Sequence, residues 1–234
     1  MILSQRPLLL LSSRPWNATL AERLRLALGR PVHIYSQVDE LHLKSVIALD
    51  PEWIFVPHWS HLIPKDIWGR WPTVIFHMSD LPYGRGGSPL QNLIQRGHVN
   101  TMVSALHCSN DLDAGPIYCK RPLSLHGTAE EICIRADSII ETMILHIVQE
   151  RPNPEPQDGE AVLFRRRKPE QSNLRHCPAG DLTSCYDHIR MLDADGYPHA
   201  FLEVHGLRLE FRRVCRRSDG LHADVLIQSN LHTH

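Results

Sequence analysis

The sequence carries almost no excess charge. Its 25 Lys and Arg residues stand against 26 Asp and Glu residues, so the formal net charge of the 234-residue chain is -1. A protein that binds a polyanion commonly presents a basic excess to it. The near-neutral balance therefore disfavours a nucleic-acid partner such as tRNA.

Long apolar runs are also missing. The run at residues 7–11 is far shorter than the roughly 20 apolar residues that a membrane-spanning helix needs. Ser12-Ser13-Arg14-Pro15 follows it at once, which does not fit the cleavage region of a signal peptide. We interpret the run as a buried first strand and expect no membrane association.

Paired cysteines and a metal-ligand pattern are absent as well. The six cysteines show no C-x-x-C spacing, which predicts reduced thiols and a cytoplasmic protein. His58 and His61 lie three residues apart and His77 follows, but no Cys or Glu adds a third ligand at a suggestive spacing. We therefore predict no metal site.

What the sequence does contain is an alternation of apolar runs and amphipathic segments. Apolar runs separated by helical patterns predict βαβ units and a mostly parallel sheet. The expected strands are residues 8–13, 32–36, 53–57 and 73–78, with helices at residues 17–28 and 39–49. Extended segments at 100–108 and 115–125 precede a helix that Thr128 and Glu131 open as a capping box and that runs to about Glu150.

The composition changes after that helix. Residues 151–159 hold three prolines and a glycine, which predict a linker rather than a helix. A helix at 182–192 and strands at 199–204, 207–214 and 223–227 follow, the first two forming a hairpin around His205-Gly206. We expect a catalytic core at 1–150, a linker at 151–172 and a small β-rich unit at 173–234, whose exposed faces would allow a homodimer.

Chemistry is concentrated between Val74 and Gly115. His77 ends an apolar strand, where open α/β sheets place their ligands, and a glycine-rich loop follows at residues 79–89. Asp111 and Asp113 lie on a later tight loop, so a carboxylate could orient the imidazole in an acid/base pair. On residue chemistry alone, the commoner interpretation is a strand-end histidine bonded to a carbonyl and two aspartates that stabilise a turn.

The pattern around these residues is less common than the residues themselves. It resembles the formyltransferases that use 10-formyltetrahydrofolate, a family that includes methionyl-tRNA, glycinamide ribonucleotide and sugar N-formyltransferases. The resemblance is densest over residues 73–125 and resumes at 186–198. The residues that carry it are His77, Ser79, Leu81, Pro82, Arg85, Gly86, Ser88, Pro89, Gln91, Leu112, Asp113 and Gly115.

The resemblance implies a Rossmann-like core and a role for each matched residue. His77 would stabilise the oxyanion of the tetrahedral intermediate and protonate the leaving nitrogen, and Asp113 would orient His77 and assist proton removal from the amine. The substrate would be bound by Ser79, Arg85, Gly86, Gly87 and Ser88. The folate would be bound by Phe55, Pro57, His58, Trp59, Cys108, Asp111 and Leu112.

One position departs from the family pattern. Ile75 stands where the family has the asparagine of its Asn-x-His motif, whose amide helps to bind the formyl oxygen. Loss of one such donor typically costs about 100- to 1,000-fold in rate. Three interpretations remain open: another donor substitutes, the enzyme is slow, or the chain is a non-catalytic folate- or sugar-binding protein. We favour substitution, with His58, Ser60, His61 and Asn92 as candidates.

The choice of acceptor rests on the tail and the charge. A methionyl-tRNA formyltransferase normally has a longer, basic C-terminal domain, whereas a short β-rich tail matches the sugar N-formyltransferases. Residues 165–168 are a basic run that would meet a pyrophosphate or simply be solvated. We therefore predict formyl transfer to a nucleotide-linked amino sugar, with methionyl-tRNA as the alternative acceptor.

Overall fold

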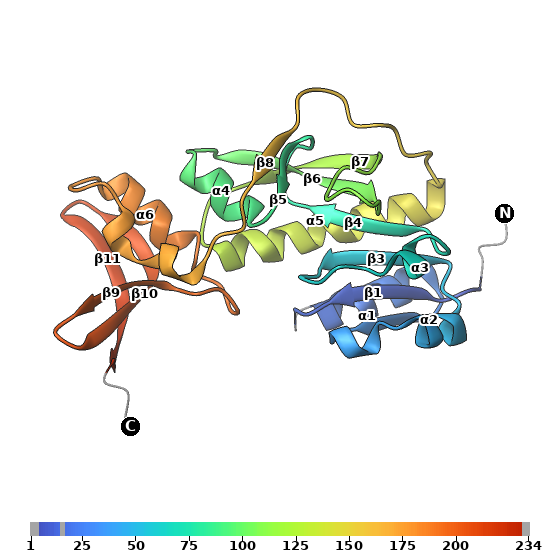
Figure 1. Ribbon diagram of the computed structural model, residues 1–234, viewed down its shortest axis with the longest axis horizontal. Coiled ribbons are helices and arrows are strands. Elements are labelled where there is room, and N and C mark those ends of the chain that lie inside the picture. Colours follow the sequence, from blue (N-terminus) through green and yellow to red (C-terminus); the bar gives the residue numbers. More distant parts are fainter. Residues whose placement is uncertain (1–4, 15–16, 231–234) are drawn as a thin grey trace. The chain divides into compact units, whose positions relative to one another are not determined.

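The larger of the sheets has six strands in the order β2-β1-β3-β4-β6-β7 (Figure 1). A computed structural model describes residues 5–14 and 17–230. The strands are β1 (Leu8–Ser12), β2 (Val32–Tyr35), β3 (Trp53–His58), β4 (Thr73–His77), β6 (Asn100–His107) and β7 (Ile117–Ser124). The first four pair in parallel and β6 runs antiparallel to β4, so the predicted α/β class with a mostly parallel sheet is confirmed.

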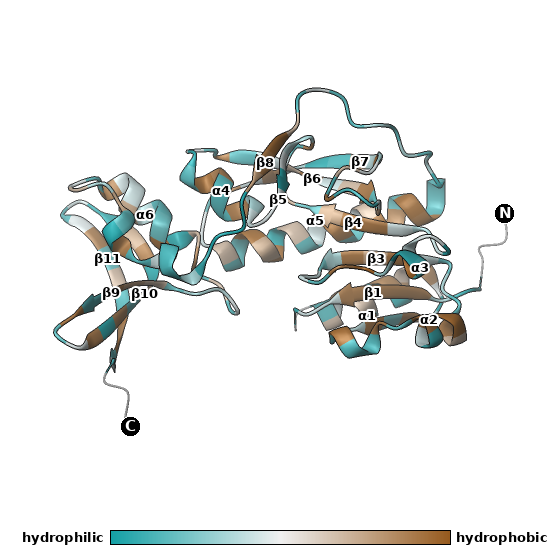
Figure 2. Cartoon of the chain, in the orientation of Figure 1, coloured by the Kyte–Doolittle hydropathy of each residue, from teal (hydrophilic) through white to brown (hydrophobic). Residues whose placement is uncertain are grey.

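Helices α1 (Asn17–Leu28), α2 (Leu43–Leu49), α3 (Lys65–Trp68) and α5 (Ala129–Glu150) accompany this sheet. One core cluster joins Leu9 and Val56 of the sheet to Val46 of α2 and Ile67 of α3, which places these two helices on one face. Figure 2 shows the apolar residues running along β1, β3 and β4, the central strands. Because both faces of these strands are covered, their sequences are continuously apolar rather than alternating.

The local structure differs from the sequence-based expectation between residues 38 and 49. The single helix expected at 39–49 is a 3₁₀ turn, Val38–Glu40, followed by α2, because His42 takes an extended conformation between them. Ser88 precedes α4 (Pro89–Gln95) but makes no side-chain cap bond to it. Its hydroxyl oxygen instead accepts a hydrogen bond from the Arg167 N–H at 3.1 Å.

Strands β9 (Ala200–Val204), β10 (Leu207–Arg217) and β11 (Gly220–Ser229) form a separate antiparallel sheet. The hairpin predicted around His205-Gly206 is confirmed, since both residues have the positive φ that a two-residue turn needs. Helix α6 (Leu182–Arg190) packs on β10. The buried Arg190 of this helix donates hydrogen bonds to the Leu125 and Gly127 carbonyls, so α6 is tied to the segment that precedes α5.

The chain divides into two compact units that are not continuous in sequence. The first contains residues 1–85, 102–123 and 135–163, and the second contains residues 86–101, 124–134 and 164–234. The division expected from the sequence, with boundaries near 150 and 173, stays a prediction. Two short strands missed in the sequence, β5 (Tyr83–Gly86) and β8 (Val162–Phe164), pair with each other where the chain passes from one unit to the next.

Candidate active site

His77 is the last residue of β4, a strand that lies between β3 and β6 in the sheet. Its side chain is 8 % exposed, and its Nε2 lies 2.7 Å from the Gly84 carbonyl oxygen. A carbonyl can only accept a hydrogen bond, so Nε2 carries the hydrogen in this arrangement. The opposite nitrogen, Nδ1, is therefore the one that remains available for other chemistry.

Asp113 supplies the carboxylate that faces this second nitrogen. Its Oδ2 lies 3.6 Å from His77 Nδ1, and its side chain is 9 % exposed. Asp113 adopts a left-handed φ of 51°, which an aspartate tolerates in a tight turn. Two residues later, a Cβ on Gly115 would lie 1.8 Å from the His107 carbonyl oxygen, so only glycine lets the loop return this close to β6.

The charge of Asp113 is also felt by a neighbouring thiol. Burial, together with the nearby Asp113 carboxylate, raises the pKa of Cys108 to about 11. Cys108 therefore stays a neutral thiol near neutral pH and acts as a small apolar side chain rather than a nucleophile.

Gln157 holds the aspartate loop in place, although the sequence marked its segment only as a linker. Its Nε2 donates to the Asp113 and Gly115 carbonyl oxygens, each at 2.8 Å. Its Oε1 accepts from Arg85 Nε at 3.0 Å and Nη2 at 2.7 Å. The Gln157 amide thus connects the loop that carries Asp113 to Arg85 of the glycine-rich loop. No motif in the sequence predicted this role of Gln157.

Ser79 and Arg85, two of the residues predicted to bind substrate, flank the His77 contact. The Ser79 hydroxyl is fully buried and donates to the Gly84 carbonyl at 3.3 Å, the same oxygen that His77 contacts. The Ser79 carbonyl in turn accepts from Ser104 Oγ at 2.7 Å. Ser79 therefore helps to position the turn that orients the imidazole.

Gly86, Gly87 and Ser88 belong to the second compact unit and are held there by residues 164–167. A Cβ on Gly86 would lie 2.4 Å from the Phe164 carbonyl oxygen, and one on Gly87 would lie 2.4 Å from Arg166 Cβ. Gly87 N donates to the same Phe164 oxygen at 3.0 Å. These contacts give both glycines a packing role, and their predicted role in binding substrate stays a prediction.

The residues predicted to bind folate lie in two segments. Pro57 and Phe55 of β3 are buried, and the Phe55 ring stacks on Trp53 with centroids 5.9 Å apart. His58 Nε2 lies 2.9 Å from Asp137 Oδ1 of α5, a partner that the sequence did not reveal. In the other segment Cys108 is buried, Asp111 is exposed, and Leu112 exposes 63 % of its surface. The folate-binding roles of these residues remain predictions.

The four donors suggested to replace the missing asparagine differ in availability. Asn92 Nδ2 has two hydrogens to donate and already lies within hydrogen-bond distance of three carbonyl oxygens, those of Gly87, Ser88 and Arg165. His58 is paired with Asp137, and Ser60 and His61 are exposed. A different donor stands out: the Trp59 indole N–H is buried and has no hydrogen-bond partner among the described residues. Trp59 and Ile75 pack against the same apolar cluster.

Other classes of site find little support in the described part of the chain. No three His, Cys, Asp or Glu side chains in residues 5–14 and 17–230 converge so as to hold a metal ion. None of the helices described is long and apolar enough to cross a membrane.

Comparison with protein families matches two models to this chain. The Formyl transferase model matches residues 22–136, and the model of the methionyl-tRNA formyltransferase C-terminal domain matches residues 169–228. Together they include His77, Asp113 and the β9–β11 sheet. The family's formyl donor is 10-formyltetrahydrofolate, so the predicted transferase class and co-substrate are confirmed at the level of the family.

Individual relatives agree with the family models. A methionyl-tRNA formyltransferase from Bacillus cytotoxicus is 27% identical over 195 residues, which are 80% of this chain and 60% of that protein. A solved methionyl-tRNA formyltransferase from Clostridium thermocellum is 44% identical, covers 95% of this chain and 99% of its own, and has a TM-score of 0.91. A sugar N-formyltransferase from Shewanella sp FDAARGOS_354 covers 97% and 98% with a TM-score of 0.65, but at 13% identity it shows the fold alone.

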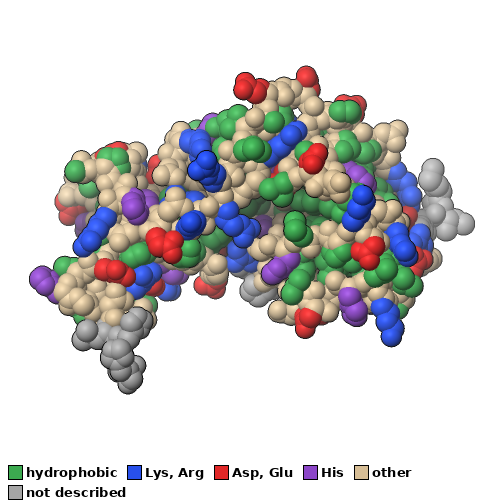
Figure 3. All heavy atoms as spheres, in the orientation of Figure 1, with side chains coloured by type: hydrophobic (Ala, Val, Ile, Leu, Met, Phe, Trp, Pro, Cys, Tyr) green, Lys and Arg blue, Asp and Glu red, His purple; other side chains and the backbone are tan. Residues whose placement is uncertain are grey.

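These relatives correct the prediction that tRNA is disfavoured as a partner. That prediction used the net charge of the whole chain, which does not describe how charge is distributed over a surface. Strand β10 carries five arginines, and basic side chains lie among acidic and apolar ones on the visible face of the β-rich unit (Figure 3). A short tail does not separate the acceptor classes either, because the C. thermocellum protein has the same extent. The chain belongs to the formyl transferase family.

Proposed function

We propose that this protein transfers the formyl group of 10-formyltetrahydrofolate to the amino group of methionyl-tRNA. The observation that carries the chemistry is the His77 imidazole, held by the Gly84 carbonyl on one side and facing the Asp113 carboxylate on the other. The 44% identity to a methionyl-tRNA formyltransferase over 99% of that chain supports the acceptor. The chain spans 60% of the length of its Bacillus cytotoxicus relative.

Formyl transfer forms a C–N bond to the acceptor amine and breaks the bond between the formyl carbon and the folate nitrogen. The amine loses one proton and the departing nitrogen gains one, so a pair of groups that exchanges a proton can serve both steps. Asp113 would accept the proton of the amine, directly or through a water. His77 Nδ1 would hold a proton beside the developing oxyanion and then release it to the departing nitrogen.

The residues present suit a folate. A flat, polar ring system needs apolar walls and a few fixed hydrogen-bonding groups. The exposed Leu112 and the neutral, buried Cys108 flank Asp113 in the chain, and Ile75 and Trp59 pack against the apolar cluster between the sheet and helices α2 and α3. The unpartnered Trp59 N–H is a donor that the formyl oxygen could use in place of the missing asparagine amide.

The acceptor is proposed to be held by the second part of the chain. Chemistry would reside in residues 1–150, and residues 173–234 would contact the acceptor, with residues 151–172 between them. Arg208, Arg212 and Arg213 of β10 pair with acidic side chains. The contacts to RNA phosphates would therefore come from Arg216 and Arg217 of β10 and from the basic run at 165–168, since arginine binds phosphate through a planar pair of N–H groups. Both the substrates and the reduced cysteines are consistent with a cytoplasmic protein.

The test is a formyl-transfer assay with three classes of acceptor: methionyl-tRNA, free methionine and a panel of nucleotide-linked amino sugars. We expect turnover with methionyl-tRNA and a fall in kcat/KM of about 100- to 10,000-fold in His77→Ala, the range typical of a lost acid/base group. The matched control is His33→Ala, which changes an exposed histidine on the edge strand β2.

Each alternative outcome has a distinct reading. Turnover with an amino sugar but not with methionyl-tRNA would restore the acceptor first predicted from the sequence. Formate release without any amine would identify a hydrolase. Tight folate binding with no turnover of any acceptor would identify a non-catalytic binding protein and would reject the proposed role of His77.

A further inference from the structure

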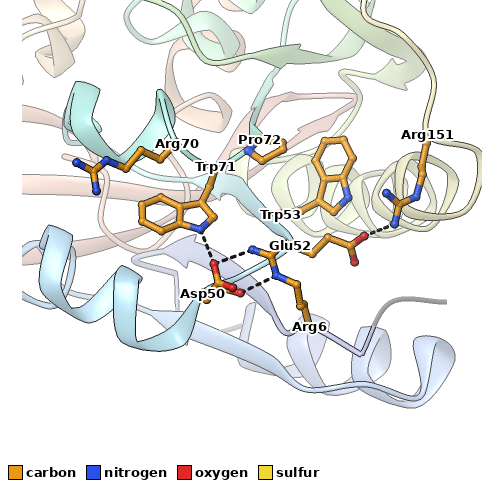
Figure 4. A pocket seen from close by; sticks show the side chains of 8 residues that line it. All are labelled: Arg6, Asp50, Glu52, Trp53, Arg70, Trp71, Pro72 and Arg151. Atoms are coloured by element: carbon orange, nitrogen blue, oxygen red, sulfur yellow. Dashed lines mark hydrogen bonds and ion pairs between the residues drawn. The ribbon is translucent and has the colours of Figure 1, made fainter.

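Two adjoining cavities lie at the opposite end of the strands from His77. Their volumes are about 450 and 580 Å³, and both are lined by Trp53, Arg70, Trp71, Pro72 and Arg151. Figure 4 shows the first of them. Each volume falls within the roughly 300–1,000 Å³ range of small-molecule pockets.

The position of the cavities separates them from the candidate active site. Trp53 begins β3 and Pro72 precedes β4, whereas His77 is the residue that ends β4. Thr73 and His77 are four residue steps apart along the extended chain, a rise of about 13 Å. A ligand in these cavities would therefore not occupy the place of the formyl group.

Aromatic side chains form the walls of the cavities. Trp53 comes from β3, Trp68 from α3, Trp71 from the turn after α3 and Tyr118 from β7. The Trp71 indole N–H donates to Asp50 Oδ1 at 3.1 Å. Trp53 is more than nine-tenths buried. Its indole N–H has no hydrogen-bond partner among the described residues.

An unpartnered buried donor of this kind is destabilising, so a ligand that supplies an acceptor gains from it. In Figure 4 the Trp53 indole lies between Pro72 and Arg151, with its nitrogen on the side of Glu52 and Arg151. The donor therefore points toward the side of the cavity on which Arg151 lies, and its nitrogen is itself buried.

The cavities are lined by more arginines than carboxylates. Asp50 pairs with Arg6 at 2.7 Å, and Glu52 is paired with both Arg151 and the buried Arg30. Arg70 is exposed, and in the described part of the chain its guanidinium has no hydrogen-bond or ion-pair partner. Both carboxylates are thus neutralised by arginines and one guanidinium is left over, which suits an anionic ligand and not an ammonium group.

We propose that these cavities bind a 5′-nucleoside monophosphate. The base would pack against the tryptophan rings, since stacking of a base on an aromatic side chain is favourable for every base. The phosphate would meet Arg70, and an acceptor atom of the nucleotide would receive the Trp53 N–H. This site is separate from the proposed formyl-transfer chemistry and does not depend on it.

The test follows the indole N–H signals of the ¹⁵N-labelled full chain by NMR during titration with adenosine 5′-monophosphate. Single Trp→Phe variants assign each signal. We expect the Trp53 signal to shift downfield as its N–H gains an acceptor. Adenosine without phosphate and inorganic phosphate without a base should each bind at least tenfold more weakly than the nucleotide.

Two variants and one control complete the test. Trp53→Phe and Arg70→Gln should each weaken binding at least tenfold by calorimetry. If Trp53→Phe fails to fold, Arg70→Gln still tests the site, because Arg70 is exposed and holds no other group. Arg25→Gln, which removes an exposed arginine on α1, should leave binding unchanged.

Several results would overturn the proposal. No shift of the Trp53 signal at millimolar nucleotide would reject the site. A shift confined to the Trp59 signal would place the ligand at the other end of the strands. Equal binding of inorganic phosphate would reject the aromatic part of the argument, and equal binding of adenosine would reject the anionic part.

Discussion

Gln157 offers the sharpest test of how the structure positions the candidate catalytic groups. Substitution by alanine removes two donations to the carbonyl oxygens of Asp113 and Gly115 and leaves the Arg85 guanidinium without its Gln157 partner. The substitution touches neither His77 nor the Asp113 carboxylate. Any effect on activity would therefore act through the placement of the loop.

The magnitude follows from the bonds lost. A neutral hydrogen bond contributes about 0.5–1.5 kcal/mol and one to a charged group about 1.5–3 kcal/mol. Gln157 is only partly buried and water can replace some of its bonds, so the low end applies and we take about 2–3 kcal/mol. If that loss is felt in the transition state, kcat/KM falls about 30- to 150-fold, since 1.4 kcal/mol corresponds to tenfold.

The assay is steady-state formyl transfer, with thermal unfolding measured on the same samples. Gln157→Glu separates the two halves of the interaction, because it keeps an acceptor for Arg85 but loses both donations to the aspartate loop. We expect it to resemble Gln157→Ala. Gln149→Ala, an exposed site near the end of α5, is the matched control and should keep full activity. A Gln157→Ala enzyme that is folded and within threefold of the unsubstituted protein would refute the argument.

Three further predictions concern the ion pair of Glu52 with Arg30 and the indole of Trp59. Burial opposes ionisation of Glu52, but hydrogen bonds from Arg30 and Arg151 outweigh it and lower its pKa below the ordinary 4.5. Its stabilisation is therefore complete above about pH 4.5 and is lost as the pH falls through the lowered pKa, which urea unfolding between pH 3 and 7 would detect. Arg30→Met should cost about 3–5 kcal/mol, because it leaves a buried carboxylate with one partner fewer, and an unchanged unfolding midpoint would contradict this. If the Trp59 N–H binds the formyl oxygen, Trp59→Phe should lower kcat about 100-fold without loss of stability. Adding Ile75→Asn to the Trp59→Phe protein should recover activity, because it supplies the amide donor of the family motif.

Local sequence patterns predicted the regular elements well where a short-range interaction decides them. Thr128 and Glu131 form the expected capping box, with Glu131 Oε2 accepting from Thr128 N at 2.8 Å. The His205-Gly206 turn and the continuous apolar strands follow from equally local rules. The helix expected at 39–49 was wrong, because its apolar spacing did not reveal that His42 would be extended.

The residues of the candidate site could be predicted only in part from the sequence. His77 could be assigned to a strand end from its neighbours alone, and the resemblance paired it with Asp113. Gln157 could not be found in this way, since a glutamine in a proline-rich segment has no distinguishing pattern. The Asp137 partner of His58 was equally hidden, because it lies on a helix whose apolar stripe was the evident feature.

The sequence by itself determined the α/β class, the glycine-dependent turns and the family, because these depend on residue type and spacing along the chain. Only the tertiary structure decided which groups are left without partners. Trp53 and Trp59 are ordinary apolar residues in the sequence, and their unpartnered indole N–H groups become visible only when every neighbouring acceptor is in place. The same holds for charge. The net charge follows from the sequence, but which arginines are left unpaired and can bind an anion depends on the fold.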